Sequence, residues 1–238
     1  MNVSYVIASG RPWNRDLPER LRSRLGCRGD HFVPVTAPAE LTRASLDRLA
    51  AQGKAPRYVF FPHWSHIIPE DIHGAFECVI FHMTDLPFGR GGSPLQNLIS
   101  RGITRTKISA LRCEKGLDTG PIYLKRDLSL EGSAEEIFLR ADRIIEDMIV
   151  EMIEKEPKPQ PQTGEPTLFK RRTPDMSNLK DAVSLDDAYD LIRMLDADGY
   201  PRAFLDIGPL RIEFSRAARK ADGIAADAKI TLREKTKE

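Results

Sequence analysis

A chain of 238 residues is long enough for one substantial core and a smaller appendage. Its 36 lysines and arginines nearly balance 35 aspartates and glutamates, and the formal net charge of +1 argues against a nucleic-acid partner, because phosphate contacts dominate such binding. Three scattered cysteines (Cys27, Cys78 and Cys113), no secretory leader and no apolar run of roughly 20 residues predict a reduced, cytoplasmic protein without membrane contact.

The first 100 residues alternate between short apolar strands and helices. We expect strands at 3–9, 31–35, 57–62 and 77–82, and helices at 16–25, 45–51 and 94–100. Nearly continuous apolar strands separated by helices predict an α/β fold with a Rossmann-like, mostly parallel sheet and helices on both faces. Ligands bind such sheets beyond the carboxyl ends of the strands, and His82 lies at one of these ends.

The second half of the chain combines two strands, a long helix and a small tail. We expect strands at 107–113 and 121–130, helices from Ser133 and over 184–195, and a hairpin over 203–215. The prolines of 156–166 cannot continue a helix. We therefore expect a catalytic domain at 1–156, a proline-rich linker at 157–167 and a small α+β subdomain at 168–238, with the charged end 226–238 frayed.

His82 is followed by a glycine-rich loop. Gly89, Gly91 and Gly92 permit the backbone conformations of a tight loop around a ligand, and Arg90 adds a fixed positive charge. This arrangement suits a ligand or a developing negative charge. A structural histidine beside an ordinary surface loop is the alternative.

Asp118 lies between Gly116 and Gly120 in a second loop after a strand. Such an aspartate commonly caps its own backbone, and that alternative stays open. Because we expect both loops at the same edge of the sheet, Asp118 is also placed to orient and charge-stabilise the His82 imidazole. No serine or cysteine nucleophile is close in sequence, so the pair indicates proton handling. The two histidines of 63–66 lack a third ligand for a metal.

Three ordered motifs resemble the formyltransferases that use 10-formyltetrahydrofolate. The family's Asn-x-His, Ser-Leu-Leu-Pro-x-x-Arg-Gly and Leu-Asp-Thr-Gly-Pro segments match residues 80–82, 84–91 and 117–121. An Ile-Ile-Pro turn within 67–72 resembles the family's Ile-Leu-Pro turn, so the likeness extends over about residues 57–125.

The resemblance implies a formyltransferase fold, 10-formyltetrahydrofolate as co-substrate and no metal. It also implies that His82 takes or relays the proton of the accepting amine, and that Asp118 orients and charge-balances His82. Folate contacts are expected from Ile68, Thr84, Leu86, Pro87, Arg90, Gly91, Lys115 and Gly116.

The segments 168–177, 188–195 and 200–208 resemble formyltransferases that act on nucleotide-linked amino sugars. The chain is too short for the large tRNA-binding domain of a methionyl-tRNA formyltransferase. The resemblance therefore implies formylation of a UDP- or dTDP-linked 4-amino-4,6-dideoxy sugar for a surface glycan, with the pseudaminic-type branch most similar. The expected partner is this small nucleotide sugar, with no nucleic acid, and the amphipathic tail allows a homodimer. The alternatives are a non-catalytic member of the fold that binds folate or a sugar nucleotide, and a formyltransferase for another small amine.

Two residues depart from the family's motifs. Ile80 stands in place of the asparagine and cannot donate a hydrogen bond to the formyl oxygen, a loss of about 2.7–4 kcal/mol of barrier stabilisation. Three interpretations are open. His82 and backbone N–H groups suffice, or Thr84, Ser65 or His66 replaces that donor, or the protein is catalytically weak. Asp85 stands in place of leucine and either contacts substrate or caps the loop.

Contacts to the sugar nucleotide are expected from two segments. Trp13, Asn14 and Arg15 follow the first strand and offer stacking and phosphate contacts, with a surface turn around a buried tryptophan as the alternative. Lys170 and Arg171 are divided in the same way between diphosphate binding and solvated charge.

Overall fold

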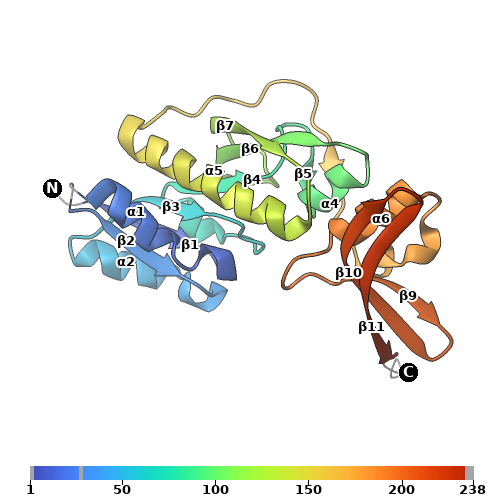
Figure 1. Ribbon diagram of the computed structural model, residues 1–238. Coiled ribbons are helices and arrows are strands. Elements are labelled where there is room, and N and C mark those ends of the chain that lie inside the picture. Colours follow the sequence, from blue (N-terminus) through green and yellow to red (C-terminus); the bar gives the residue numbers. More distant parts are fainter. Residues whose placement is uncertain (1–2, 27–28, 234–238) are drawn as a thin grey trace. The chain divides into compact units, whose positions relative to one another are not determined.

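The computed structural model describes residues 3–26 and 29–233, so the prediction for Cys27 lies outside the described residues. The chain forms two compact units that alternate along the sequence (Figure 1). The first comprises Met1–Gly91, Thr106–Leu128 and Leu139–Leu168, and the second comprises Gly92–Arg105, Ser129–Phe138 and Phe169–Glu238.

A six-stranded sheet forms the centre of the first unit. Its strands, in spatial order, are β2 (His31–Val35), β1 (Ser4–Ala8), β3 (Pro56–Phe61), β4 (Cys78–His82), β6 (Arg105–Arg112) and β7 (Ile122–Ser129). β1 is parallel to β2 and β3, and β3 is parallel to β4, whereas β4 and β6 are antiparallel. The prediction of a mostly parallel sheet in an α/β fold is confirmed.

Both faces of this sheet are covered, which explains why the strand β1 inside it is buried at every position. On β1, Val6 and Ala8 point to one face and Tyr5 and Ile7 to the other, and all four are at most 4% exposed. Val6 and Ala8 pack with Leu46 in one buried cluster. Tyr5 stacks among the aromatic rings of the neighbouring strands on the other face.

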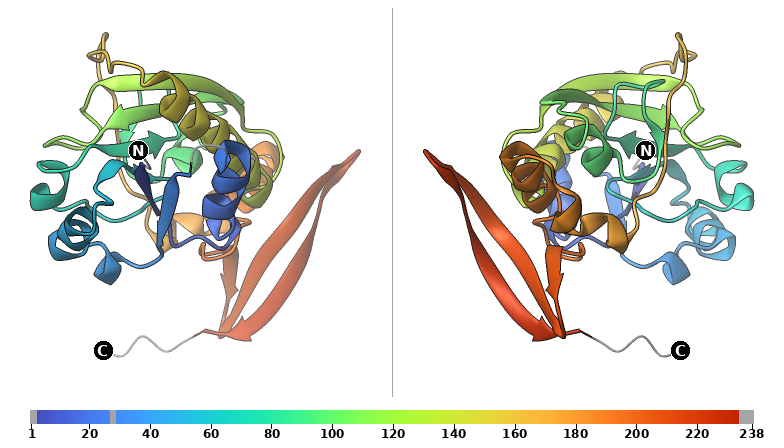
Figure 2. Two further views of the ribbon diagram at one scale, coloured as in Figure 1. Left: turned by 90° about the vertical axis from the view of Figure 1, so that its left-hand side faces the viewer. Right: turned by 90° about the vertical axis from the view of Figure 1, so that its right-hand side faces the viewer.

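Helices cover the two faces of the sheet (Figure 2). Figure 2 shows α2 (Arg43–Ala51) on the face opposite to α1 (Leu17–Leu25) and α5 (Ala134–Lys155). Buried charges join α1 to α5, because Arg20 pairs with Asp142 at 2.5 Å and with Glu146 at 2.6 Å. Burial raises the pKa of Asp142 to about 6, although Arg20 opposes the rise.

The second unit contains α4 (Pro94–Ile99), α6 (Leu185–Arg193) and a three-stranded antiparallel sheet in the order β11-β10-β9. The strands are β9 (Ala203–Ile207), β10 (Leu210–Lys220) and β11 (Gly223–Leu232), and β10 and β11 form a long hairpin (Figure 2). Gln96 of α4 donates to the Met194 carbonyl at 3.0 Å, and Asn97 donates to the Lys170 carbonyl at 2.9 Å. The middle of the sequence is therefore fastened to its C-terminal part.

The structure adds elements that the sequence did not predict. These are α3 (Glu70–His73), a ladder of β5 (Arg90–Gly91) with β8 (Leu168–Phe169), and β11. The expectation of a frayed end is wrong up to Leu232, because β11 pairs along β10 from Gly223 to Leu232. Residues 234–238 lie outside the described part of the chain. Among the described helices, none combines the length and the apolar character needed to cross a membrane.

Candidate active site

His82 is the last residue of β4, and its side chain is 8% exposed. Its Nε2 lies 2.8 Å from the carbonyl oxygen of Gly89. Because a carbonyl oxygen accepts but cannot donate, Nε2 carries the hydrogen of the neutral ring and Nδ1 keeps the lone pair. Nδ1 is therefore the atom of His82 that can accept a proton.

Asp118 faces this nitrogen. Its Oδ2 lies 3.6 Å from His82 Nδ1 and accepts a 2.9 Å hydrogen bond from the N–H of Gly91. At 3.6 Å the carboxylate is beyond hydrogen-bond distance, so it leaves the lone pair of Nδ1 available. Its negative charge nevertheless favours a positive charge on the imidazole.

The two loops meet, but not for the reason that we expected. β6 is antiparallel to β4, with His82 opposite Ser109. The loop after β6 therefore begins near the start of β4, where the N–H of Cys113 donates to the Cys78 carbonyl at 2.8 Å. The expectation that both loops share one edge of the sheet is wrong. Asp118 reaches His82 because its loop turns back toward the end of β4.

Arg90 is engaged with another side chain. Its Nη2 and Nε lie 2.8 Å and 3.2 Å from Oε1 of Gln162. Gln162 in turn donates 2.8 Å hydrogen bonds to the carbonyls of Asp118 and Gly120. Gln162 was not predicted from the sequence, because a single glutamine in a proline-rich segment gives no signal of a site.

The thiol nearest to these loops is not reactive. Burial, together with the nearby charges of Asp118 and Glu114, raises the pKa of Cys113 to about 11. Burial also raises the pKa of Cys78. Both thiols stay protonated near neutral pH, so the site suits proton handling and not attack by a cysteine.

Several side chains that we expected to contact folate lie in the interior. Thr84 and Leu86 are 0% and 1% exposed, and the Thr84 hydroxyl donates to the Gly89 carbonyl at 3.3 Å. Ile68 belongs to the hydrophobic core. In this structure these side chains shape the loops from behind, and their predicted contacts to folate stay a prediction.

Other residues of the same loops remain accessible. Pro87 and Phe88 are half-buried, Lys115 and Gly116 are exposed, and Leu117 beside Asp118 is 60% exposed. Apolar surface next to convergent polar groups is typical of small-molecule sites. Their contacts to a folate stay a prediction.

The structure gives physical reasons for the two departures from the motifs. Ile80 is half-buried and packs against the core cluster that contains Phe61, so an apolar side chain is stabilised there. Asp85 pairs with Lys107 and Lys125. Although burial opposes the effect, these two lysines hold the pKa of Asp85 below its usual range. Asp85 is thus an internal ion-pair partner.

A cavity of about 160 Å³ lies at the carboxyl ends of β1, β2 and β3. His63, Trp64, Ser65 and His66 contribute to its lining. Burial and the charge of Arg11 lower the pKa of His63 to about 3, so this ring is neutral at physiological pH. Ser65 and His66 are exposed and remain candidates to replace the missing asparagine, whereas Thr84 is not.

The residues expected to bind a sugar nucleotide differ in how far they are exposed to solvent. Asn14 is 3% exposed and its amide donates to Asp142 of α5, so its predicted ligand contact is wrong. Trp13 is half-buried and lies edge-on to His63, with ring centroids 5.9 Å apart. The remaining three are exposed: Arg15, Lys170 and Arg171.

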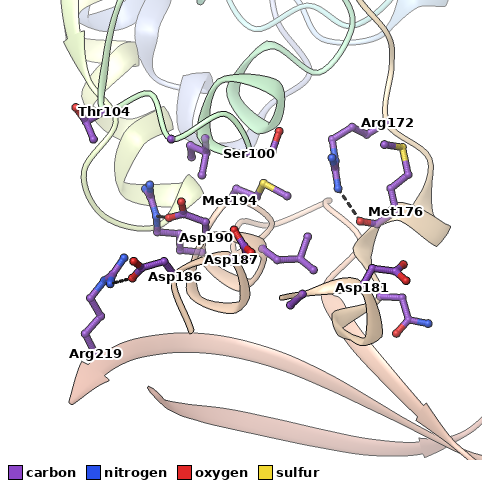
Figure 3. A pocket seen from close by; sticks show the side chains of 16 residues that line it. Ser100, Thr104, Arg172, Met176, Asp181, Asp186, Asp187, Asp190, Met194 and Arg219 are labelled. Atoms are coloured by element: carbon purple, nitrogen blue, oxygen red, sulfur yellow. Dashed lines mark hydrogen bonds and ion pairs between the residues drawn. The ribbon is translucent and has the colours of Figure 1, made fainter. Parts of the chain in front are cut away.

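A larger cavity of about 500 Å³ lies within the second unit (Figure 3). Figure 3 shows Arg219 paired with Asp186, and Arg172 donating to the Met176 carbonyl. Four aspartates and three arginines line the cavity, so it does not favour a polyanion. Within the described residues, no group of three or more His, Cys, Asp or Glu side chains is arranged to hold a metal ion.

Comparison with known proteins identifies relatives of the chain. Residues 174–231 match the family model described as "Methionyl-tRNA formyltransferase, C-terminal domain". A solved structure of a methionyl-tRNA formyltransferase from Clostridium thermocellum is 48% identical with a TM-score of 0.92, over 97% of this chain and 100% of that chain. The methionyl-tRNA formyltransferase of Thermodesulfovibrio yellowstonii is 29% identical over 66% of this chain, which spans 52% of that relative's length.

A solved structure of a likely sugar N-formyltransferase from Mycobacterium tuberculosis has a TM-score of 0.67 over the whole of both chains, but at 17% identity it shows the fold alone.

These findings correct the predicted substrate. The nucleotide-linked amino sugar, and with it the absence of a nucleic-acid partner, is wrong, because relatives at 48% and 29% identity are named methionyl-tRNA formyltransferases. The two alternatives, a non-catalytic binding protein and a formyltransferase for another small amine, match no better. The length of the chain does not exclude a methionyl-tRNA formyltransferase, because residues 174–231 match the model of that family's C-terminal domain. With 48% identity over the full length of a solved relative, the chain belongs to the formyltransferase family.

Proposed function

We propose that this chain transfers the formyl group of 10-formyltetrahydrofolate to the amino group of methionine carried on tRNA. The observation that carries the proposal is the 48% identity to a structure named methionyl-tRNA formyltransferase, over 100% of that chain. The donor is the one that the family uses, as the sequence predicted.

The geometry of His82 and Asp118 supports this chemistry. Formyl transfer forms a bond from the amine nitrogen to the formyl carbon and breaks the bond to N10 of the folate. The amine loses one proton and the departing N10 requires one. Nδ1 of His82 is placed to accept the first and supply the second, and Asp118 at 3.6 Å stabilises the imidazolium in between.

The tail supports an acceptor that is attached to nucleic acid. Over Leu210–Leu232, the hairpin carries five basic residues against three acidic ones. Lys220 and Lys229 are both exposed on it. The net charge of +1 is a sum over the whole chain, and it does not prevent local phosphate contacts of this kind.

The test is to incubate the protein with 10-formyltetrahydrofolate and methionyl-tRNA, and to measure formylmethionine by mass spectrometry after release from the tRNA. Free methionine and uncharged tRNA serve as negative controls. A methionyl-tRNA formyltransferase of established activity is the positive control. The proposal predicts formylation of methionyl-tRNA alone. Absence of product under conditions where the positive control goes to completion would refute it.

A further inference from the structure

The segment between α5 and β8 is held at both sides of Gln162. The backbone of Gln160 exchanges two 2.8 Å hydrogen bonds with Ile122. Further along, the N–H of Thr167 donates to the Pro87 carbonyl at 3.2 Å, and the Thr167 carbonyl accepts from the Arg90 N–H at 2.9 Å. Prolines between these anchors restrict the backbone further. Gln162 is therefore presented from a constrained segment and not from a loose linker.

The amide of Gln162 joins two loops at once. Its nitrogen donates to the carbonyls of Asp118 and Gly120, each at 2.8 Å, and its oxygen accepts from Arg90. These partners fix the orientation of the amide, because two carbonyls require a donor and a guanidinium requires an acceptor.

One of the two carbonyls that Gln162 bonds belongs to a residue with a strained backbone. Asp118 has a φ of 52°, in the left-handed region that costs non-glycine residues about 1 kcal/mol or more. Gly120 has no room for a side chain, since a Cβ there would lie 1.9 Å from the Arg112 carbonyl oxygen. The turn thus packs tightly against the end of β6, and Gln162 donates hydrogen bonds to its Asp118 and Gly120 carbonyls. The direction of the Asp118 carboxylate toward His82 depends on this turn.

From these contacts we propose that Gln162 is a positioning residue for formyl transfer, which acts by holding the Asp118 turn so that its carboxylate faces Nδ1 of His82. The inference rests on the proposed function for its kinetic effect. The hydrogen bonds themselves are independent of the substrate. A residue with this role affects turnover more than substrate affinity, because it acts through the position of the Asp118 carboxylate.

The kinetic test compares Gln162→Ala with Gln160→Ala. The side chain of Gln160 is exposed and bonds the Lys158 carbonyl nearby, so it is a matched control. We expect Gln162→Ala to lower kcat about tenfold or more with little change in either KM, and Gln160→Ala to have no effect. Gln162→Glu keeps an acceptor for Arg90 but repels the two carbonyls, so it should be as impaired as Gln162→Ala. A raised KM with unchanged kcat would overturn the proposal.

A double-mutant cycle tests whether the effect passes through Asp118. In an Asp118→Asn background, adding Gln162→Ala should cost much less than it does in the wild type, because the carboxylate it positions is gone. Additive losses would show that Gln162 acts elsewhere and would contradict the proposal.

Hydrogen exchange gives a readout that needs no substrate. In Gln162→Ala the amides of residues 113–121 should exchange faster than in the wild type and in Gln160→Ala, while the amides of β4 keep their protection. Unchanged exchange in the loop would overturn the positioning role. If the wild-type protein fails to formylate methionyl-tRNA, the proposed function falls, and the exchange experiment still decides whether Gln162 holds the turn.

Discussion

Asp118→Asn removes the negative charge of the Asp118 side chain while nearly keeping its size and shape. Asparagine retains a carbonyl oxygen that can accept the hydrogen bond of the Gly91 N–H, and it tolerates the left-handed φ of 52° at least as well as aspartate. The change therefore removes a negative charge 3.6 Å from His82 Nδ1 without a steric reason for the loop to move.

The distance sets the size of the expected effect. Both side chains are less than 10% exposed, and at an effective dielectric constant of about 20 two unit charges 3.6 Å apart interact by about 4.6 kcal/mol. If half a positive charge has formed on the imidazole in the transition state, the loss is about 2.3 kcal/mol, or roughly 50-fold in kcat. A fully formed imidazolium gives a loss on the order of 10³.

Steady-state kinetics with both substrates measure this effect. Asp127→Asn removes an equal charge from an exposed position on β7 and serves as the control. We expect kcat to fall by the stated factor in Asp118→Asn alone, with the two KM values nearly unchanged. A variant whose kcat is intact but whose KM for folate rises would refute the reasoning, since Asp118 would then be a ligand contact.

Four further predictions follow from the described residues. His82→Ala should fold with an unchanged circular dichroism spectrum yet lose nearly all transfer, and near-normal turnover would refute its role. Ile80→Asn should not raise kcat, because its amide would be left short of partners beside the core at a penalty of about 1–3 kcal/mol; a tenfold gain would contradict this. Burial raises the pKa of Asp142 from 3.8 to about 6, so the folded state binds this proton more tightly than the unfolded state does. The stability that the bound proton contributes is fully present below pH 3.8 and is lost as the pH rises through 6. The free energy of unfolding of Asp142→Asn, minus that of the wild type, should therefore rise by about 2–3 kcal/mol from pH 3.5 to pH 7 in urea titrations. A difference that does not change with pH would contradict this account. Charge reversal at Lys220 and Lys229 should lower kcat/KM for methionyl-tRNA and make it less dependent on salt, and an unchanged salt slope would exclude phosphate contacts there.

The sequence was most informative where a segment is buried on both sides. Apart from Ser4 and His82 at their ends, β1 and β4 are apolar, and that pattern predicts the covered parallel strands that the structure has. The same pattern carries no information on direction, because an antiparallel strand buried on both faces reads the same. β6 was therefore placed correctly along the sequence while its antiparallel pairing with β4 was missed.

The candidate site was predictable as far as residue types and motif order go. His82 and Asp118 are brought within 3.6 Å of each other, but through a loop that turns back and not through a shared edge. Gln162 could not be predicted from the sequence, because its role comes from contacts with residues more than 40 positions away. The substrate was predicted wrongly because the prediction followed a likeness of short tail segments to sugar formyltransferases, whereas residues 174–231 match the model of the methionyl-tRNA formyltransferase C-terminal domain.

The alternation of the two units along the sequence limits how the chain can be divided. α4 comes from the middle of the sequence, yet Gln96 and Asn97 bond the carbonyls of Met194 and Lys170, and Arg101 stacks on Phe169. A protein truncated after the proline-rich segment would keep α4 but lose these partners and expose part of its apolar surface. Expression of residues 1–168 alone should therefore give an aggregation-prone fragment, and an exchange of tails between relatives must carry α4 along with the tail.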